Sequence, residues 1–171
     1  PEYKISVHKL SEYIKAFKES RINLKVDRVG TGFLRKLYAT YSSYQNENQF
    51  SYPLKKYSDQ RGDFVEILKT INSGQFAYFT AYPGITRGGH YHHTKCEKFV
   101  VVKGIAKFTF RNILNKKFYE KVAESKIPEV VESIPGWTHN ITNIGSNELV
   151  VFVWSSEVFD ASNPDTYASK I

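Results

Sequence analysis

The chain has 171 residues, 41% of them hydrophobic and 15% aromatic, so it can bury a core without disulfide cross-links. Its single cysteine excludes an internal disulfide and a four-cysteine zinc site, and it favours a reducing, cytoplasmic location. The formal net charge of +7 indicates an anionic partner. Membrane association is not expected, because no apolar stretch approaches spanning length and we identify no secretory signal.

The first 45 residues carry helical patterns. Ser6 is a suitable N-cap for a first helix, in which apolar residues recur every three or four positions: Val7, Leu10, Ile14 and Phe17. After Gly32 the same spacing predicts a second helix with these apolar positions: Phe33, Leu34, Leu37, Tyr38 and Tyr41. The stretch 42–51 is rich in Ser, Asn and Gln and is interpreted as a connector.

After residue 52, short β-branched and aromatic runs alternate with Gly, Pro and Asn. These runs predict eight strands, at 63–70, 76–82, 97–102, 106–112, 118–122, 130–134, 139–143 and 149–155. Many short strands without intervening helices indicate a mainly-β fold, either a sandwich or a small barrel. The polar tail from residue 159 onward is expected to pack loosely.

Four of the five histidines lie in two short segments. His90 and His92 share one face of an extended strand, because side chains alternate along it, and Glu97 follows where the next strand begins. His139 on a later strand would complete a set of three nitrogens and one oxygen for a divalent metal. The alternative interpretation of these residues is a histidine-rich surface loop.

Two motifs connect these segments to a known family. Residues 84–104 fit Gly-x5-His-x-His-x4-Glu-x6-Gly, and residues 135–143 fit Pro-x-Gly-x2-His-x3-Asn except that the residue between Pro135 and Gly136 is missing. The paired motifs resemble those of the cupins. The resemblance implies a double-stranded β-helix, or jelly roll, over about residues 53–158, with zinc bound inside the barrel. Iron, manganese or nickel would suit the same ligands.

Two further segments narrow the resemblance. Residues 59–66 look like the Asp-x-Arg-Gly-x-Phe-x-Glu signature of nucleotide-sugar 3,5-epimerases, and residues 86–99 are more similar still to the C-terminal cupin of CapF-type enzymes. Those bifunctional enzymes of capsular polysaccharide biosynthesis join a short-chain dehydrogenase/reductase domain to a zinc-containing cupin. The resemblance implies that residues 1–45 are the tail of an absent reductase domain and that residues 46–171 are a metal-binding cupin that forms homodimers. An initial Pro and the lack of Met agree with a fragment.

The implied activity is C3 epimerisation of a UDP-linked 4-keto-6-deoxy-N-acetylhexosamine, on the path to UDP-N-acetyl-L-fucosamine. The absent reductase domain would then reduce C4 with NADPH. The chain itself lacks a glycine-rich dinucleotide fingerprint, so no NAD(P) site is expected, and no nucleic-acid-binding motif accompanies the basic residues. Two alternatives stay open: an iron cupin dioxygenase or other oxidoreductase, and a non-catalytic, metal-stabilised module that binds sugar nucleotide and dimerises.

Epimerisation needs groups that remove and return a proton. His93, Tyr91 and Lys98 are candidates because they neighbour the ligands, although all three point away from them on a regular strand. A bulge at the double glycine 88–89 would change that phase and make His93 a ligand in place of His92.

The predicted contacts to the substrate are two arginines that neighbour glycines close to the motifs, Arg61 and Arg87. Either guanidinium can grip a diphosphate through two hydrogen bonds. In the epimerase family the arginine of the Asp-x-Arg-Gly signature has this role, and Arg61 matches it. For Arg87, a solvated surface position is an equal alternative.

Overall fold

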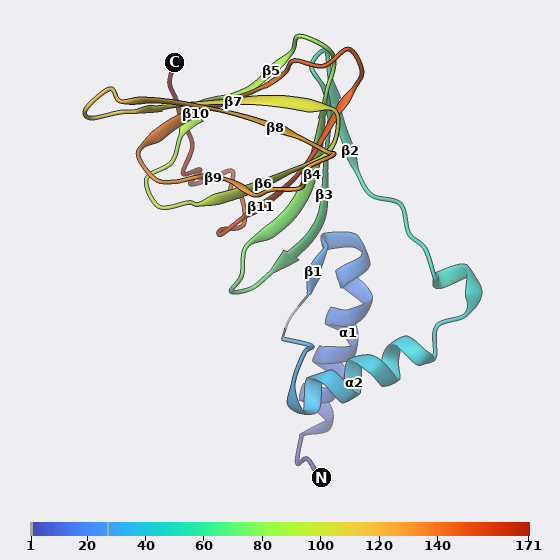
Figure 1. Ribbon diagram of the computed structural model, residues 1–171. Helices are drawn as coiled ribbons and strands as arrows, with labels where there is room; N and C mark the ends of the chain where they lie inside the picture. The colour runs from blue at the N-terminus through green and yellow to red at the C-terminus, as the bar shows by residue number, and fades with distance from the viewer. Residues whose placement is uncertain (1, 27) are drawn as a thin grey trace.

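The computed structural model describes residues 2–26 and 28–171, and Figure 1 shows a β-barrel with a helical segment attached at one side. The helical segment contains α1 (Val7–Asn23), β1 (Lys25–Val26), α2 (Gly32–Ser43) and a 3₁₀ turn (Glu47–Gln49). Both helices lie where the sequence predicts them. As predicted, Ser6 caps α1, and its hydroxyl accepts a hydrogen bond from the Lys9 backbone N–H at 3.2 Å.

The barrel consists of eleven of the strands in the described residues. They are β2 (Lys56–Asp59), β3 (Gly62–Thr70), β4 (Gln75–Ala81), β5 (Thr86–Tyr91), β6 (Glu97–Lys103), β7 (Ile105–Asn112), β8 (Phe118–Glu124), β9 (Val131–Ser133), β10 (Trp137–Asn143), β11 (Leu149–Ser155) and β12 (Tyr167–Ala168). All eight predicted strands are present. The prediction omitted β5, which contains two glycines, and the short strands β1, β2 and β12.

Two sheets face each other across the core, as in a jelly roll (Figure 1). The first has the order β1-β3-β4-β11-β6-β9, with β2 also paired to β3, and the second has the order β12-β5-β10-β7-β8. The fold is therefore mainly β, as predicted. Among the described residues, no helix has both the length and the apolar character needed to cross a membrane.

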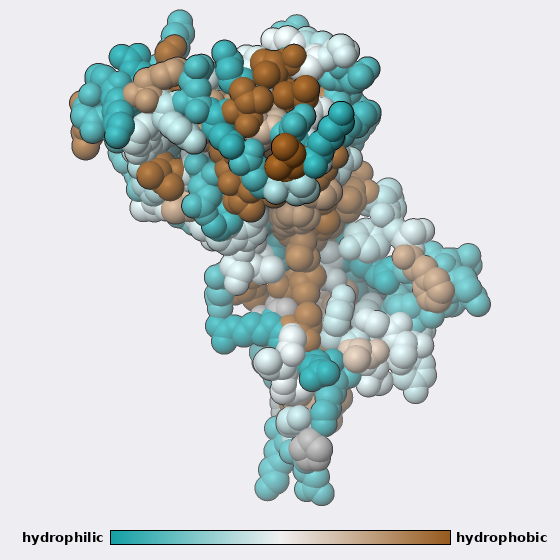
Figure 2. Space-filling view, viewed as in Figure 1, coloured by the Kyte–Doolittle hydropathy of each residue, from teal (hydrophilic) through white to brown (hydrophobic). Residues whose placement is uncertain are grey.

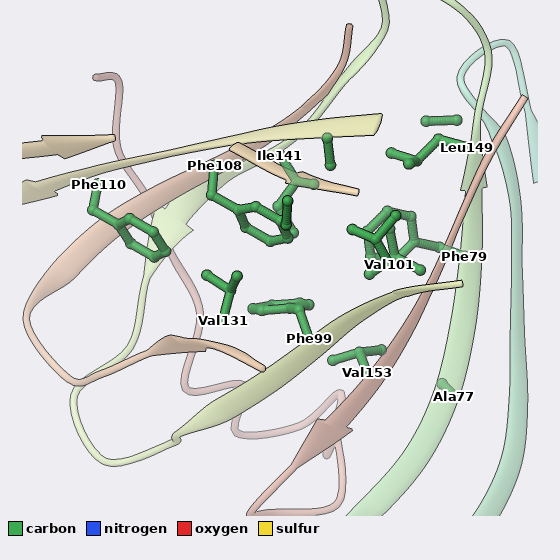
Figure 3. Packing of buried hydrophobic residues seen from close by; sticks show 14 residues of the cluster. Ala77, Phe79, Phe99, Val101, Phe108, Phe110, Val131, Ile141, Leu149 and Val153 are labelled. Carbon is green, nitrogen blue, oxygen red and sulfur yellow. The ribbon is translucent and has the colours of Figure 1, made fainter. Parts of the chain in front are cut away.

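The space between the sheets is filled by aromatic and β-branched side chains (Figure 3). Phe108 and Leu149 are fully buried, and the Phe99 and Phe108 rings from opposite sheets lie 5.8 Å apart. The helical segment buries far less: within its two helices only Phe17 and Ser20 are buried. Figure 2 accordingly shows apolar surface on the barrel and along its junction with the helical segment.

Strand register divides the interior of the first sheet into apolar and polar rows. One cross-strand row is apolar and contains Ala77, Val153, Phe99 and Val131. The next inward-facing row lies two residues further along each strand. It is polar and contains Gln75, Ser155, Glu97 and Ser133. All eight residues are buried, so the polar row is part of the interior and needs hydrogen-bond partners there.

Candidate metal centre

Strand β5 reaches the interior by means of a β-bulge. Ile141 of β10 pairs with Arg87, and His139 pairs with His90, so a two-residue step along β10 matches a three-residue step along β5. The side chains of Ile141 and His139 are both buried. The bulge therefore places His90 beside His139 on the inner face of the second sheet.

The bulge depends on Gly88 and Gly89, which have φ values of 107° and 75°. This is backbone that favours glycine, and a Cβ on Gly88 would lie 2.4 Å from the carbonyl oxygen of His139. A bulge at these glycines was predicted to bring His93 into the ligand set in place of His92. The bulge is present, but His92 is the residue whose ring joins the cluster.

Four side chains meet inside the barrel. They are the four predicted metal ligands, His90, His92, Glu97 and His139, and each offers one ligand atom within 4.8 Å of the others. His90 is partly buried and the other three are buried. The structure thus brings together β5, the turn that follows it, β6 and β10 around one point.

The surroundings of the cluster set its charge. Burial raises the pKa of Glu97, but contact with His92 and the charge of His139 outweigh it and bring the pKa to about 2. Burial lowers the pKa of His139 to about 3, and burial together with the neighbouring His92 lowers the pKa of His90. At neutral pH the cluster therefore presents a carboxylate with neutral imidazoles at His90 and His139, the protonation states that metal binding requires.

The distances between the donor atoms suit a divalent cation. Nε2 of His92 and Nε2 of His139 lie 3.1 Å and 3.4 Å from Oε2 of Glu97. Metal–ligand bonds of about 2.0–2.1 Å in a tetrahedron separate neighbouring donor atoms by about 3.3 Å. Three imidazoles and one carboxylate accept zinc and also iron, manganese or nickel.

Two serines hold the ligands in place. Ser133 Oγ lies 2.8 Å from Nδ1 of His139, and Ser155 Oγ donates to Oε1 of Glu97 at 3.1 Å. Both belong to the polar row of the first sheet. Neither serine was predicted from the sequence, although each occupies an inward position of a predicted strand. A serine that faces inward from a predicted strand was the feature by which these two residues could have been found.

The C-terminal tail is ordered against this site, so the expectation of loose packing was wrong. Strand β12 pairs with β5, and the Asp165 carboxylate accepts hydrogen bonds from the backbone N–H groups of His93, Thr94 and Lys95 at 2.8–2.9 Å. The backbone carbonyl of Asp165 is bonded to Nδ1 of His92. The tail was judged by its polar composition, but its carboxylate satisfies N–H groups of the β5–β6 turn that no strand partner reaches.

A cavity of about 290 Å³ opens next to the cluster. Its lining comes from both sheets and from the tail, and comprises Phe64, Glu66, Gln75, His90, Lys95, Glu97, Val153, Ser155, Phe159 and Thr166. Besides the residues of the cluster, two side chains in this lining can carry charge, Glu66 and Lys95. Glu66 is paired with Lys69 at 2.9 Å, and Lys95 Nζ donates to the Thr166 hydroxyl at 3.3 Å.

The three predicted proton carriers are not part of this lining. Tyr91 stacks on Tyr167 with ring centroids 5.4 Å apart, and His93 contacts the same ring at 4.5 Å. Lys98 is half exposed and forms an ion pair with Glu132. Their catalytic roles stay predictions, although the structure gathers other groups beside the ligands.

The two predicted diphosphate-binding arginines lie near each other, also outside the cavity lining. Arg61 is bonded to Asp59, with Nη2 2.6 Å from the carboxylate, and this bond lowers the pKa of Asp59 to about 2. Arg87 donates to the carbonyl of Thr80 at 2.8 Å, and its side chain is only 12% exposed. Arg87 thus connects backbone segments, and diphosphate binding by either arginine stays a prediction.

A jelly roll that holds three histidines and one glutamate inside its barrel defines the class of cupin proteins, which agrees with the resemblance seen in the motifs. The chain belongs to the family described as the polysaccharide biosynthesis C-terminal domain, whose profile matches residues 57–167. This match covers the whole barrel except part of β2 and the end of β12.

The chain is similar to two proteins over nearly all of its length. It is 55% identical over 171 residues to a UDP-2-acetamido-2,6-beta-L-arabino-hexul-4-ose reductase of Pseudomonas aeruginosa, and covers 46% of that protein. The capsular polysaccharide assembling protein CapF of Staphylococcus aureus matches with a TM-score of 0.94 and 38% identity, over 99% of this chain and 46% of that one. The chain therefore spans slightly under half the length of these relatives.

Two other solved structures add to this result. CapF with the inhibitor 3-isopropenyl-tropolone matches with the same TM-score of 0.94 and 38% identity, over 99% of this chain and 49% of that one. A recombinant oxalate oxidase matches over 74% of this chain and 66% of that one, with a TM-score of 0.55 and 20% identity. At that identity the likeness shows the shared fold alone.

Proposed function

We propose that this chain is the epimerising domain of a nucleotide-sugar enzyme that inverts C3 of a UDP-linked 4-keto-6-deoxy-N-acetylhexosamine. The observation that carries the proposal is the buried cluster of three histidines and Glu97 beside a cavity of about 290 Å³. The relatives support it, because one is named for a UDP-linked hexulose and the other for capsular polysaccharide assembly.

The chemistry follows from the position of C3 next to the C4 ketone. Loss of the C3 proton leaves an enolate, whose negative charge lies mainly on the C4 oxygen. A divalent cation, with zinc as the proposed occupant, would be held by His90, His92, Glu97 and His139 and would supply a Lewis acid for that oxygen.

The chain's own side chains account for binding and proton transfer. The Glu66 carboxylate, on strand β3, can accept the C3 proton, and the Lys95 ammonium, on the β5–β6 turn, can return one to the other face of the ring. Water would reset both groups after each turnover. Phe64 and Phe159 give the same cavity an apolar part that positions the sugar and limits access of water to the enolate.

Deuterium exchange tests this function. The chain loaded with zinc is incubated in D2O with the UDP-linked 4-keto sugar, and deuterium at C3 is followed by NMR and mass spectrometry. Exchange with inversion at C3 is expected, and exchange should stop after zinc removal. If the zinc-loaded chain gives no exchange, the epimerase proposal fails. Metal analysis of the purified chain separates it from an iron oxidoreductase, because zinc cannot activate oxygen.

Two further proposals concern the whole protein. Because the relatives are about twice as long, residues 1–45 are proposed to be the end of a reductase domain that reduces C4 with NADPH. A homodimer is proposed on family grounds, and exposed apolar residues on the edge strand β8, such as Phe118 and Val122, offer it a surface. Light scattering checks the second proposal, since a monomeric mass would contradict it.

A further inference from the structure

The C-terminal tail supplies one residue, Asp165, that contacts the metal cluster and the adjacent turn at once. Its carboxylate accepts three backbone N–H bonds from residues 93–95, and Oδ2 also accepts from the Thr94 hydroxyl at 3.0 Å. Burial raises the pKa of Asp165, but the N–H groups of His93, Thr94 and Lys95 outweigh burial and hold the pKa well below its usual value. The carboxylate therefore holds the turn as an anion.

The backbone carbonyl of Asp165 acts on His92 itself. A carbonyl oxygen can only accept, so its bond to Nδ1 requires that Nδ1 carry the proton. In the neutral ring Nε2 then presents its lone pair toward Oε2 of Glu97, 3.1 Å away. Without a metal, a proton shared between Nε2 and Oε2 can hold these two atoms together, and a bound divalent cation would take the place of that proton.

His92 differs in this respect from the other ligands. The hydroxyl partner of His139, Ser133, and that of Glu97, Ser155, come from strands of the first sheet. The partner of His92 lies 73 positions later in the sequence, in the tail. The orientation of this ligand thus depends on whether the tail is docked, and docking depends on the Asp165 carboxylate.

We infer that Asp165 is a positioning residue for the metal centre, which fixes the tautomer of His92 through its carbonyl and the docking of the tail through its carboxylate. The inference rests on the proposed metal site. Residues that orient a histidine ligand typically contribute about 10–100-fold to metal affinity. Loss of the carboxylate should therefore weaken zinc binding while the barrel stays folded, since the core cluster contains no tail residue.

The test compares Asp165→Ala and the milder Asp165→Asn with a matched control, Asp160→Ala. The control also removes a tail carboxylate, but one whose partners among the described residues, Ser162 and Asn163, belong to the tail itself. Zinc affinity is measured by competition with a chromophoric chelator. The protonated nitrogen of each histidine is assigned by long-range ¹H–¹⁵N NMR in the zinc-free chain.

We expect Asp165→Ala to weaken zinc binding about 10–100-fold and to give a mixture of His92 tautomers. The zinc affinity of Asp165→Asn should lie between those of the wild type and Asp165→Ala. Asp160→Ala should match the wild type in both zinc affinity and His92 tautomer. If the Ala variant does not fold, Asp165→Asn decides, because the amide oxygen can still accept one N–H bond. Zinc affinity and a His92 tautomer unchanged in the folded Asp165 variants would overturn the inference. A wild-type chain that binds no zinc would instead refute the metal site.

Discussion

The two ends of the barrel interior are built from the same strands but have opposite character. At one end, rows of Phe, Val and Ala fill the space between the sheets (Figure 3). At the other end, the next inward row is Gln75, Ser155, Glu97 and Ser133, and the histidines of the second sheet face it. The first end satisfies its residues by contact alone, whereas the second needs a hydrogen bond for each polar atom.

The two ends of the barrel interior therefore have different roles: one contributes to stability, and the other holds the groups that can do chemistry. The apolar end removes hydrocarbon from water and contributes to the free energy of folding. The polar end gathers ionisable groups whose pKa values are displaced by burial and by one another, as at Glu97 and His139. Substitutions at the apolar end should therefore lower the free energy of unfolding, whereas substitutions at the polar end should change its dependence on pH.

The largest expected effect on stability is at the apolar end. Phe108→Ala removes a ring that is fully buried and packs against Phe99 at a centroid distance of 5.8 Å, so we expect a loss of about 3–5 kcal/mol in the free energy of unfolding. Urea denaturation followed by fluorescence measures the loss. The matched control is Phe118→Ala on the neighbouring strand, where the ring is half exposed. Equal losses for the two variants would contradict this view of the core.

The second prediction concerns pH and the polar end of the zinc-free chain. The pKa of His139 is about 3 in the fold, so between about pH 6.5 and pH 3 the unfolded chain binds a proton that the folded chain does not. Stability is therefore greatest above pH 6.5 and falls as the pH decreases, by about 1.4 kcal/mol for each pKa unit of displacement. Glu97, with a pKa of about 2, adds a loss below about pH 4.5.

Thermal unfolding of the zinc-free chain from pH 8 to pH 4 measures this slope. The variant His139→Gln should flatten it between pH 6.5 and pH 4. The control is His8→Gln, which removes an exposed histidine of α1 that lies outside the cluster. An unfolding temperature independent of pH in the wild type would show that the polar end is not held in the protonation states inferred for it.

Much of the fold could be predicted from the sequence, because the strands carry alternating apolar residues and the breaks carry Gly and Pro. Strand β5 was not among the eight predicted strands, although His90 was expected on extended backbone. The sequence raised a bulge at Gly88 and Gly89 as a possibility, and the register with β10 shows that the bulge is present. The four residues of the cluster were predicted from motif spacing, and the structure brings them together. Features that depend on residues close together in the sequence could therefore be predicted from it.

The remainder of the site could not be predicted, because it depends on contacts between distant segments. Asp165 contacts residues 93–95 across 70–72 positions of the sequence, and the polar composition of the tail alone suggested loose packing. Glu66 belongs to a recognised signature, but only the fold shows that it lines the same cavity as Lys95. Proximity to a ligand in sequence favoured Lys98, yet that side chain pairs with Glu132 at the surface.

The third prediction compares these two lysines on either side of Glu97. Lys95 is buried in the cavity lining and Lys98 is half exposed, so Lys95→Met should reduce epimerisation about 100-fold, equivalent to about 2.7 kcal/mol, while Lys98→Met stays near the wild-type rate. Steady-state NMR assays of C3 inversion measure both rates. With Glu66 intact, Lys95→Met should still exchange C3 hydrogen with D2O without inversion. The opposite ranking of the two variants would support the earlier prediction for Lys98.

The smallest effect tests the bulge that brings the two ends together. Gly88→Ala places a Cβ 2.4 Å from the carbonyl of His139, a backbone atom that cannot move aside freely, and we expect a cost of about 2 kcal/mol together with weaker zinc binding. Gly89→Ala is the matched control: its φ of 75° is also positive but lies closer to the left-handed region, and the nearest atom to its Cβ would be 3.8 Å away. That variant should cost only about 1 kcal/mol, the backbone part of the penalty. Chemical denaturation and zinc titration are measured for both variants. Equal losses in the two variants would mean that the contact with the His139 carbonyl adds nothing to the backbone penalty, and would contradict this view of the bulge.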